Sequence, residues 1–224
     1  MPRPGHLLAL AALCTAGAVA AAPVSQTVTI TGFPYGYVAV DTSLTGVVAA
    51  GELGGTRVSG TTSYPLLTYC TEITQGSFLN TAYSDYEIVN NGTTYGFTAT
   101  QAQRLGALYT LAGALVDTRD ESAAFQLSVW EIMHEASTNP LNLLSGSFLV
   151  ESIASQTPLT LASSWLNTIS QPGALNSYDV QRLHSPTGQD YVLFNRVPEP
   201  AVGGLAVLAL GLLALSRRGM RSRA

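Results

Sequence analysis

The sequence predicts an α+β protein whose antiparallel β-rich part precedes a segregated helical part and a closing pair of strands. Over residues 24–97, apolar and polar side chains alternate between glycine-rich turns, as they do in half-buried strands. The apolar spacing becomes helical over residues 100–169 and returns to alternation over residues 178–196. Strands and helices in separate stretches of a chain are typical of the α+β class.

The β-rich part begins with a strand at residues 24–31, followed by one or two strands within residues 35–50. A further strand is expected at residues 66–73, with Cys70 inside it. Residues 86–90 and 93–97 flank Asn91-Gly92, a strong signal for a hairpin turn. The closing strands, residues 178–184 and 190–196, are joined by a Ser-Pro-Thr-Gly turn and form a second hairpin.

Three helices are expected between these groups of strands, at residues 100–116, 122–136 and 157–169. The second begins beside Asp120 and Glu121, whose charges suit a helix N-terminus. The third begins with a threonine-proline pair, and proline is favoured at the first helical position.

The second helix carries a glutamine in the middle of its apolar face. Ser128, Glu131 and Glu135 lie on the opposite face, where we expect the two glutamates to form a solvated stripe. Burying the amide of Gln126 without a partner would cost on the order of 2 kcal/mol. Gln126 therefore needs a hydrogen-bonding partner, and the simplest one is backbone. The apolar face around it holds Phe125, Val129, Ile132, Met133 and Ala136, with Trp130 at its edge.

The N-terminus predicts a signal peptide at residues 1–22. A weakly positive start precedes an alanine-rich apolar run at residues 7–22, and small residues fit cleavage between Ala20 and Ala22. A retained N-terminal anchor is the alternative. The remaining residues, 23–196, have the size of one domain.

The C-terminus combines Val197-Pro198-Glu199-Pro200, an apolar run at residues 201–215 and four arginines. The run predicts a short transmembrane helix, with the arginines on the cytoplasmic side. The order of these parts closely resembles the PEP-CTERM sorting signal, over residues 197–224. This resemblance implies a Gram-negative bacterium, processing by the membrane protease exosortase, and delivery to the cell surface or an extracellular biofilm matrix. A permanent membrane anchor is the alternative.

Composition argues against several partners. Residues 23–196 carry thirteen acidic residues against five arginines, and the whole chain has no lysine. This net negative charge disfavours binding to nucleic acid or anionic lipid. No cofactor is expected, and no metal site, because two histidines and one cysteine lack the spacing of a ligand set.

Cys70 is the one cysteine that remains after a signal peptide containing Cys14 is removed. Unpaired thiols are uncommon in exported proteins. Cys70 could form an intermolecular disulfide, serve as a reactive thiol, stay buried and inert, or bond to a group other than sulfur. A thiol can attack a glutamine carbonyl, expel ammonia and leave a thioester. A thioester between Cys70 and Gln126 would use the thiol and remove the buried amide, and apolar neighbours would keep water away.

Two short motifs resemble those of the thioester domains of bacterial surface adhesins. They are an aromatic-cysteine pair on a strand, Tyr69-Cys70, and the run Gln126–Trp130 at a helix start. The chain departs from the family pattern at Thr71-Glu72 and at Phe125. The resemblance implies adhesion by covalent capture, in which a target amine or hydroxyl attacks the Gln126 carbonyl carbon and releases the thiol. We expect the thioester pocket to contain Tyr69, Phe125, Val129, Trp130 and His134.

Two other functions remain open. A cysteine hydrolase would pair Cys70 with His134 or His184 as its base. A non-covalent surface or matrix protein would keep Cys70 buried and inert. The target of capture, on a protein or a polysaccharide, is not encoded in any motif.

Overall fold

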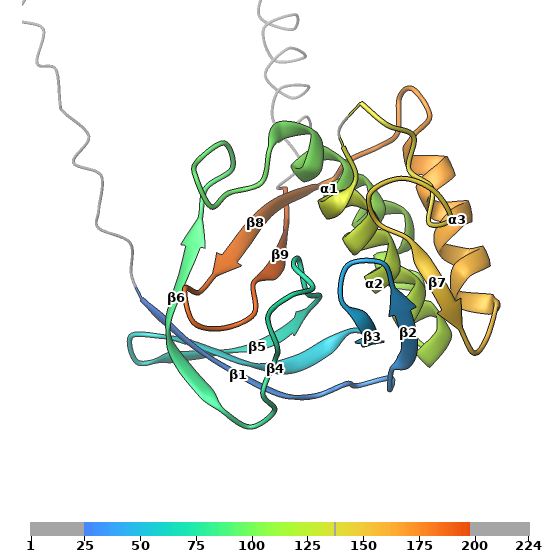
Figure 1. Ribbon diagram of the computed structural model, residues 1–224. Helices are drawn as coiled ribbons and strands as arrows, with labels where there is room; N and C mark the ends of the chain where they lie inside the picture. The colour runs from blue at the N-terminus through green and yellow to red at the C-terminus, as the bar shows by residue number, and fades with distance from the viewer. Residues whose placement is uncertain (1–24, 137, 198–224) are drawn as a thin grey trace, which may run out of the picture.

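The computed structural model describes residues 25–136 and 138–197 (Figure 1). Its larger sheet is antiparallel throughout and has six strands. Across the sheet these are, in order, β5 (Thr62–Thr68), β4 (Leu53–Ser59), β1 (Gln26–Gly32), β6 (Ala82–Val89), β8 (Tyr178–His184) and β9 (Tyr191–Arg196).

The two edge strands of this sheet meet just beyond the end of β5. Cys70 pairs with Tyr191 at the start of β9, and the Thr68 hydroxyl donates to the Val192 carbonyl at 2.6 Å. Figure 1 shows the strands curving around a shared interior. That interior is filled by Val28, Ile30, Leu53, Leu66, Tyr86, Leu183 and Tyr191. The sheet is therefore a barrel-like structure that closes at Cys70.

A smaller antiparallel sheet and three helices complete the fold. The sheet has the order β3 (Gly46–Ala50), β2 (Val38–Thr42) and β7 (Val150–Ile153). The helices are α1 (Ala99–Ala112), which runs into the short 3₁₀ turn η1 (Gly113–Leu115), α2 (Arg119–His134) and α3 (Thr157–Ile169). Between the helices and the sheets lies the larger apolar core. The predicted α+β class is confirmed as a mostly antiparallel fold with three helices.

Helix α2 is the central element of the fold. It begins at a capping box, in which the Thr118 hydroxyl accepts from the Glu121 N–H and the Glu121 carboxylate accepts from the Thr118 N–H. Every residue from Ser122 to Ile132 is buried, and α2 packs on α1, α3 and the smaller sheet. A helix that is covered all round has no solvated stripe.

The prediction of a solvated stripe on α2 is therefore wrong. Ser128 and Glu131 are buried, and so is Glu135 at the helix end. The segment after α2 turns back over this end, and its backbone donates to the two carboxylates: the Asn142 N–H to Glu131 at 2.6 Å and the Ser147 N–H to Glu135 at 2.7 Å. Polar residues on a helical wheel indicate water or a polar partner equally well, and here the partner is a loop.

Some strand predictions also differ from the structure. Strands β4 and β7 were not predicted, and β5 ends before Cys70 rather than containing it. Asn91-Gly92 forms a turn, with Gly92 at φ 79°, but it does not join a hairpin. Residues 93–97 form further turns that lead into α1 rather than a strand, and β6 pairs instead with β1 and β8.

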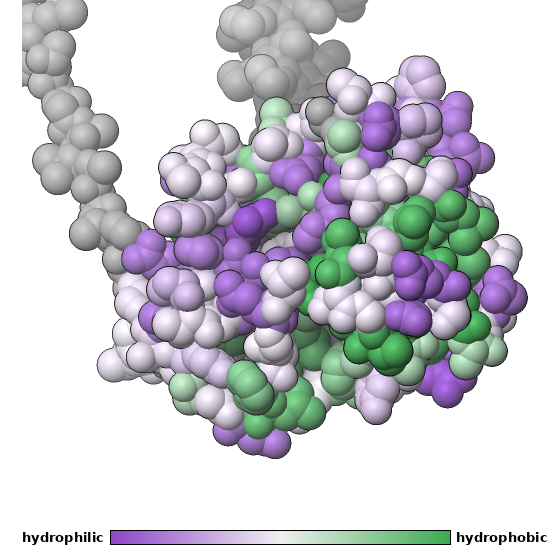
Figure 2. All heavy atoms as spheres, viewed as in Figure 1, coloured by the Kyte–Doolittle hydropathy of each residue, from purple (hydrophilic) through white to green (hydrophobic). Residues whose placement is uncertain are grey.

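The chain ends lie largely outside the described residues. The predicted signal peptide, residues 1–22, is one such segment, and the sorting signal from Pro198 onward is another; Val197 is the last described residue. Within residues 25–136 and 138–197, no helix combines the length and hydrophobicity needed to cross a bilayer. Figure 2 shows that apolar side chains gather over the smaller sheet and over the loop that leads into β6. Exposed members of these groups include Val47 and Phe78.

Candidate functional site

Barrel closure determines where the backbone of Cys70 points. The Val192 N–H donates to the Tyr69 carbonyl at 3.1 Å, and the Thr71 N–H donates to the Asp190 carbonyl at 3.0 Å. In an antiparallel pair, alternate residues turn their polar groups to opposite sides. The N–H and C=O of Cys70 therefore point away from β9, and the sheet offers them no partner.

Gln126 of α2 supplies that partner. The Cys70 N–H donates to Gln126 Oε1 at 2.9 Å, and Gln126 Nε2 donates to the Cys70 carbonyl at 2.9 Å. The amide takes the place of a neighbouring strand, so its carbonyl carbon lies alongside the Cα of Cys70. The structure thus brings together two residues 56 positions apart in the sequence. It also meets the hydrogen-bonding needs of the buried amide with backbone.

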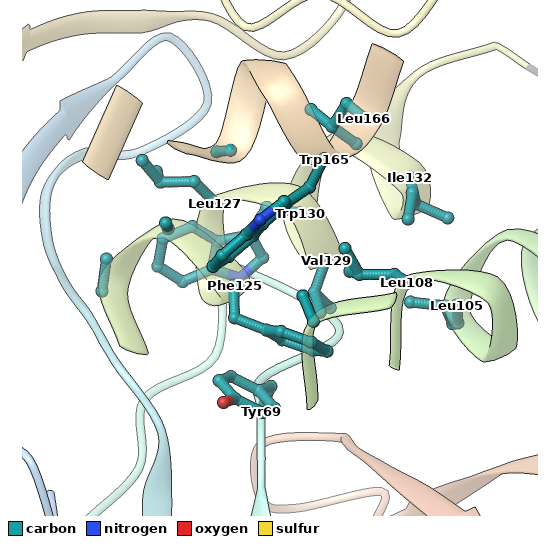
Figure 3. Packing of buried hydrophobic residues seen from close by; sticks show 14 of the residues in the cluster. Tyr69, Leu105, Leu108, Phe125, Leu127, Val129, Trp130, Ile132, Trp165 and Leu166 are labelled. Carbon is teal, nitrogen blue, oxygen red and sulfur yellow. The ribbon is translucent and has the colours of Figure 1, made fainter. Parts of the chain in front are cut away.

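Aromatic and aliphatic side chains enclose the amide from the side of the core. The rings of Tyr69 and Phe125 stack with centroids 4.4 Å apart, and Figure 3 shows Tyr69 facing Phe125, with Val129 and Trp130 nearby. All four are buried, and Gln126 itself has 0% of its surface exposed. The Trp130 indole N–H donates to the Glu72 carbonyl at 3.3 Å. This side of the amide is closed to water.

The Cys70 side chain lies at the boundary between that closed core and a pocket. It is half-buried, packs against both apolar clusters, and lines a pocket of about 410 Å³. Burial raises the pKa of the thiol to about 12; a hydrogen bond from the Ser77 side chain opposes this shift, and the charge of Glu72 adds to it. The free thiol is therefore neutral near pH 7 and is reachable from outside.

Several pocket residues were not found from the sequence. Glu72 and Ser77 follow Cys70 closely, but no pattern distinguishes them from other loop residues. Other parts of the wall come from the segment between β1 and β2, from β3, from the start of β4, and from the turn before β9. They include Phe33, Tyr37, Val48, Leu53 and Gln189. Of the five predicted pocket residues, Trp130 lines this pocket, and Tyr69, Phe125 and Val129 lie in the core beneath it.

Each of the two histidines packs against an aromatic ring. His134 packs near Phe148, does not line the pocket, and has its pKa lowered by burial and then by the charge of Arg182. His184 Nδ1 is 2.9 Å from an Asp190 carboxylate oxygen, and its ring stacks on Tyr95. Among the hydrogen bonds and ion pairs of the described residues, neither histidine reaches Cys70. The same part of the chain holds no group of three or more side chains suited to a metal ion.

Comparison with known proteins adds one structural likeness. No protein-family model matches the chain, and no curated protein matches it either. Among solved structures, the chain is similar to the N-terminal domain of the Streptococcus pyogenes pilus tip adhesin Cpa, with 14% sequence identity and a TM-score of 0.47. The alignment covers 78% of this chain and 95% of that domain. A likeness of this degree identifies neither family nor function, so the functional argument rests on the site.

Proposed function

We propose that this chain is an exported surface or matrix protein, and not an enzyme, in which a Cys70–Gln126 thioester captures a target covalently. The observation that carries the proposal is the pair of hydrogen bonds between the Gln126 amide and the Cys70 backbone. They hold the Gln126 amide against the backbone of Cys70, and holding two reacting groups close together converts a slow reaction into an intramolecular one.

Formation of the bond needs no outside reagent. The Cys70 sulfur attacks the side-chain carbonyl carbon of Gln126, a C–S bond forms, the C–N bond breaks, and the thiol proton leaves with the nitrogen as ammonia. The Cys70 N–H, 2.9 Å from Gln126 Oε1, stabilises the negative charge that this oxygen acquires in the tetrahedral intermediate. Burial of the surrounding core protects the product from hydrolysis.

Capture reverses the roles of these groups. A target amine or hydroxyl attacks the same carbon, the C–S bond breaks, and the target stays bonded to Gln126 as an amide or ester while Cys70 is released as a thiol. The chain contains no lysine that could consume its own thioester. The pocket wall includes the Glu72 carboxylate and no arginine, which favours neutral or cationic groups over anions as targets.

The cellular setting follows from the chain ends. A signal peptide would export the domain, and the tail from Val197 would anchor it transiently until an exosortase-type protease cuts it. The partners would then be that protease and a nucleophile on a neighbouring protein or polysaccharide, with membrane contact through the tail alone. The non-covalent alternative also has an observation in its favour, because the Gln126 amide is already satisfied by backbone without any thioester.

Intact mass of a polypeptide of residues 22–197, which includes every described strand and helix, tests the proposal. Expulsion of ammonia lowers the wild-type mass by about 17 Da relative to the calculated value, and Cys70→Ala runs at its full calculated mass. Methylamine then adds to the wild type and exposes one titratable thiol. A wild type at full mass refutes the thioester. In that case, a thiol that titrates only on unfolding indicates the inert surface protein, and one that titrates at once favours a hydrolase.

A further inference from the structure

A chain of hydroxyl groups leads away from the Cys70 sulfur. Ser77 lines the same pocket as Cys70, close enough for its side chain to lower the pKa of the thiol, and Ser77 Oγ lies 2.6 Å from the Tyr191 hydroxyl. The Tyr191 ring stacks on that of Tyr86, whose hydroxyl donates to the Gln189 carbonyl at 2.6 Å. The proposed function assigns no role to any of these hydroxyls.

The fold holds Ser77 in this place from two sides. Cys70 and Tyr191 form a facing pair at the barrel closure, and residues that face one another across an antiparallel pair direct their side chains to the same side. Tyr191 is buried, and its ring stacks on that of Tyr86. The loop that carries Ser77 is fastened to β1 where the Asn80 N–H donates to the Ile30 carbonyl at 2.7 Å.

Opening of a thioester at this position creates a specific difficulty. When the C–S bond breaks, sulfur departs with the bonding electrons, and a thiolate in an apolar, desolvated site is unfavourable. The sulfur must therefore receive a proton as it leaves. Meanwhile the attacking nitrogen must lose one, because an amine carries one proton more than the amide it becomes.

We propose that Ser77 is a catalytic residue that passes this proton from the attacking nitrogen to the Cys70 sulfur. The inference rests on the proposed thioester. As the carbon–nitrogen bond forms, Ser77 Oγ accepts a proton from the nitrogen and gives its own proton to the sulfur, so that the serine is unchanged after each event. Tyr191 acts through Ser77 as a positioning residue, because a hydrogen bond from its hydroxyl to Ser77 Oγ leaves the serine proton directed at the sulfur.

Other groups near Cys70 are less suited to the transfer. Glu72 Oε1 accepts from the Asp190 N–H at 3.1 Å, and its charge opposes formation of a thiolate. His184 is paired with Asp190, and His134 does not line the pocket. Ser77 lines the pocket together with Cys70, so its hydroxyl can meet both the sulfur and an incoming nucleophile.

The test compares methylamine opening of the wild-type polypeptide of residues 22–197 with that of Ser77→Ala, Ser77→Thr and Tyr191→Phe. Thr74→Ala is the matched control, because it removes an exposed hydroxyl from the same loop that is not part of the pocket wall. Intact mass first establishes that each protein carries the thioester, and thermal melting establishes that each is folded. The second-order rate constant of methylamine addition is then measured by mass at several buffer concentrations.

Ser77→Ala should lower the rate constant by about 100-fold or more, the usual contribution of a positioned proton-transfer group. Ser77→Thr should recover most of the rate, Tyr191→Phe should lose less than Ser77→Ala, and Thr74→Ala should match the wild type. Opening of Ser77→Ala should also speed up as an acidic buffer component is added, which a purely structural role would not produce. A Ser77→Ala rate within about twofold of the wild-type rate overturns the inference.

Two outcomes are separated by the mass measurement itself. If Ser77→Ala lacks the thioester while Ser77→Thr carries it, the hydroxyl is needed for acyl transfer at this sulfur, which supports the inference. The rate of methylamine opening is then compared between Tyr191→Phe and the wild type. If the wild type shows no mass loss, the proposed function fails before any rate is measured, and the proton transfer fails with it.

Discussion

The thioester should act as a cross-link that stabilises the fold. Cys70 lies at the closure of the barrel, and Gln126 lies on the central helix α2, so a bond between them joins two parts of the molecule that otherwise meet through non-covalent contacts. Treatment with methylamine opens the bond while every residue of the chain stays in place. The methylamide left on Gln126 keeps its carbonyl oxygen, so the hydrogen bond from the Cys70 N–H can form again; the N–H of the favoured trans amide lies opposite that oxygen, so the bond to the Cys70 carbonyl, which the thioester also lacks, stays absent.

The size of the effect follows from the loop that the bond closes. The two residues are 56 positions apart, and restricting the unfolded chain by a loop of this length corresponds to about 4 kcal/mol at 25 °C in the chain-entropy treatment of cross-links. For a domain of this size, 1 kcal/mol shifts the melting temperature by about 2–4 °C. Opening the thioester should therefore lower the melting temperature by about 8–16 °C.

Calorimetry on the polypeptide of residues 22–197, before and after methylamine treatment, measures this shift directly. Cys70→Ala, treated in the same way, controls for effects of methylamine that do not involve the thioester and should melt at one temperature throughout. The reasoning is refuted if intact mass shows complete opening of the wild type while its melting temperature moves by less than about 2 °C.

Three further predictions concern single side chains. Gln126→Ala should lose about 2–4 kcal/mol of unfolding free energy relative to Cys70→Ala, which also lacks the thioester, because it leaves the backbone N–H and C=O of Cys70 buried without partners; urea denaturation measures the difference. Burial raises the pKa of Glu131 to about 7 from 4.5, so the folded state holds this proton more tightly than the unfolded state, and stability should fall by about 3 kcal/mol as pH rises from 4 through 8. Glu131→Gln should remove that component of the pH dependence in urea titrations at pH 5 and 8, and an unchanged slope would contradict the assignment. Glu72→Gln should slow thioester opening by methylamine about fivefold near pH 7, because methylamine arrives mainly as the methylammonium cation, whose ion pair with a partly exposed carboxylate contributes about 1 kcal/mol, and attacks after it loses a proton. Hydroxylamine is neutral at this pH and should be affected less; equal slowing of both would count against attraction of cations by the pocket.

Local sequence patterns predicted the parts of the fold that depend on neighbouring residues. Helix α3 and strand β8 have the predicted bounds, and α2 differs by a few residues at each end. These elements follow from apolar periodicity and from caps such as the one at Thr118. Strand β4, by contrast, contains two glycines and a short apolar stretch, so its sequence carries a weak strand signal. Its place between β1 and β5 is set by pairing with both.

The polar residues of α2 show which features could be predicted from the sequence and which depended on the tertiary structure. That Gln126 needs a partner follows from its place on an apolar face, and this was predictable. That Glu131 and Glu135 are buried was not, because their partners are backbone N–H groups of a loop that turns back on the helix. A helical wheel shows which residues share a face, and it does not show what covers that face.

The sequence by itself determined the α+β class and the positions of the helices. It also showed that one cysteine lies between the two predicted end signals, and that Gln126 needs a hydrogen-bonding partner. The tertiary structure alone decided that the partner is the Cys70 backbone, and that Ser77 and Tyr191, 114 positions apart, meet beside the sulfur. The physical reason is that periodicity reports local backbone geometry. Barrel closure joins Thr68 to Val192 across 124 positions, and such pairing depends on the free energy of the whole chain.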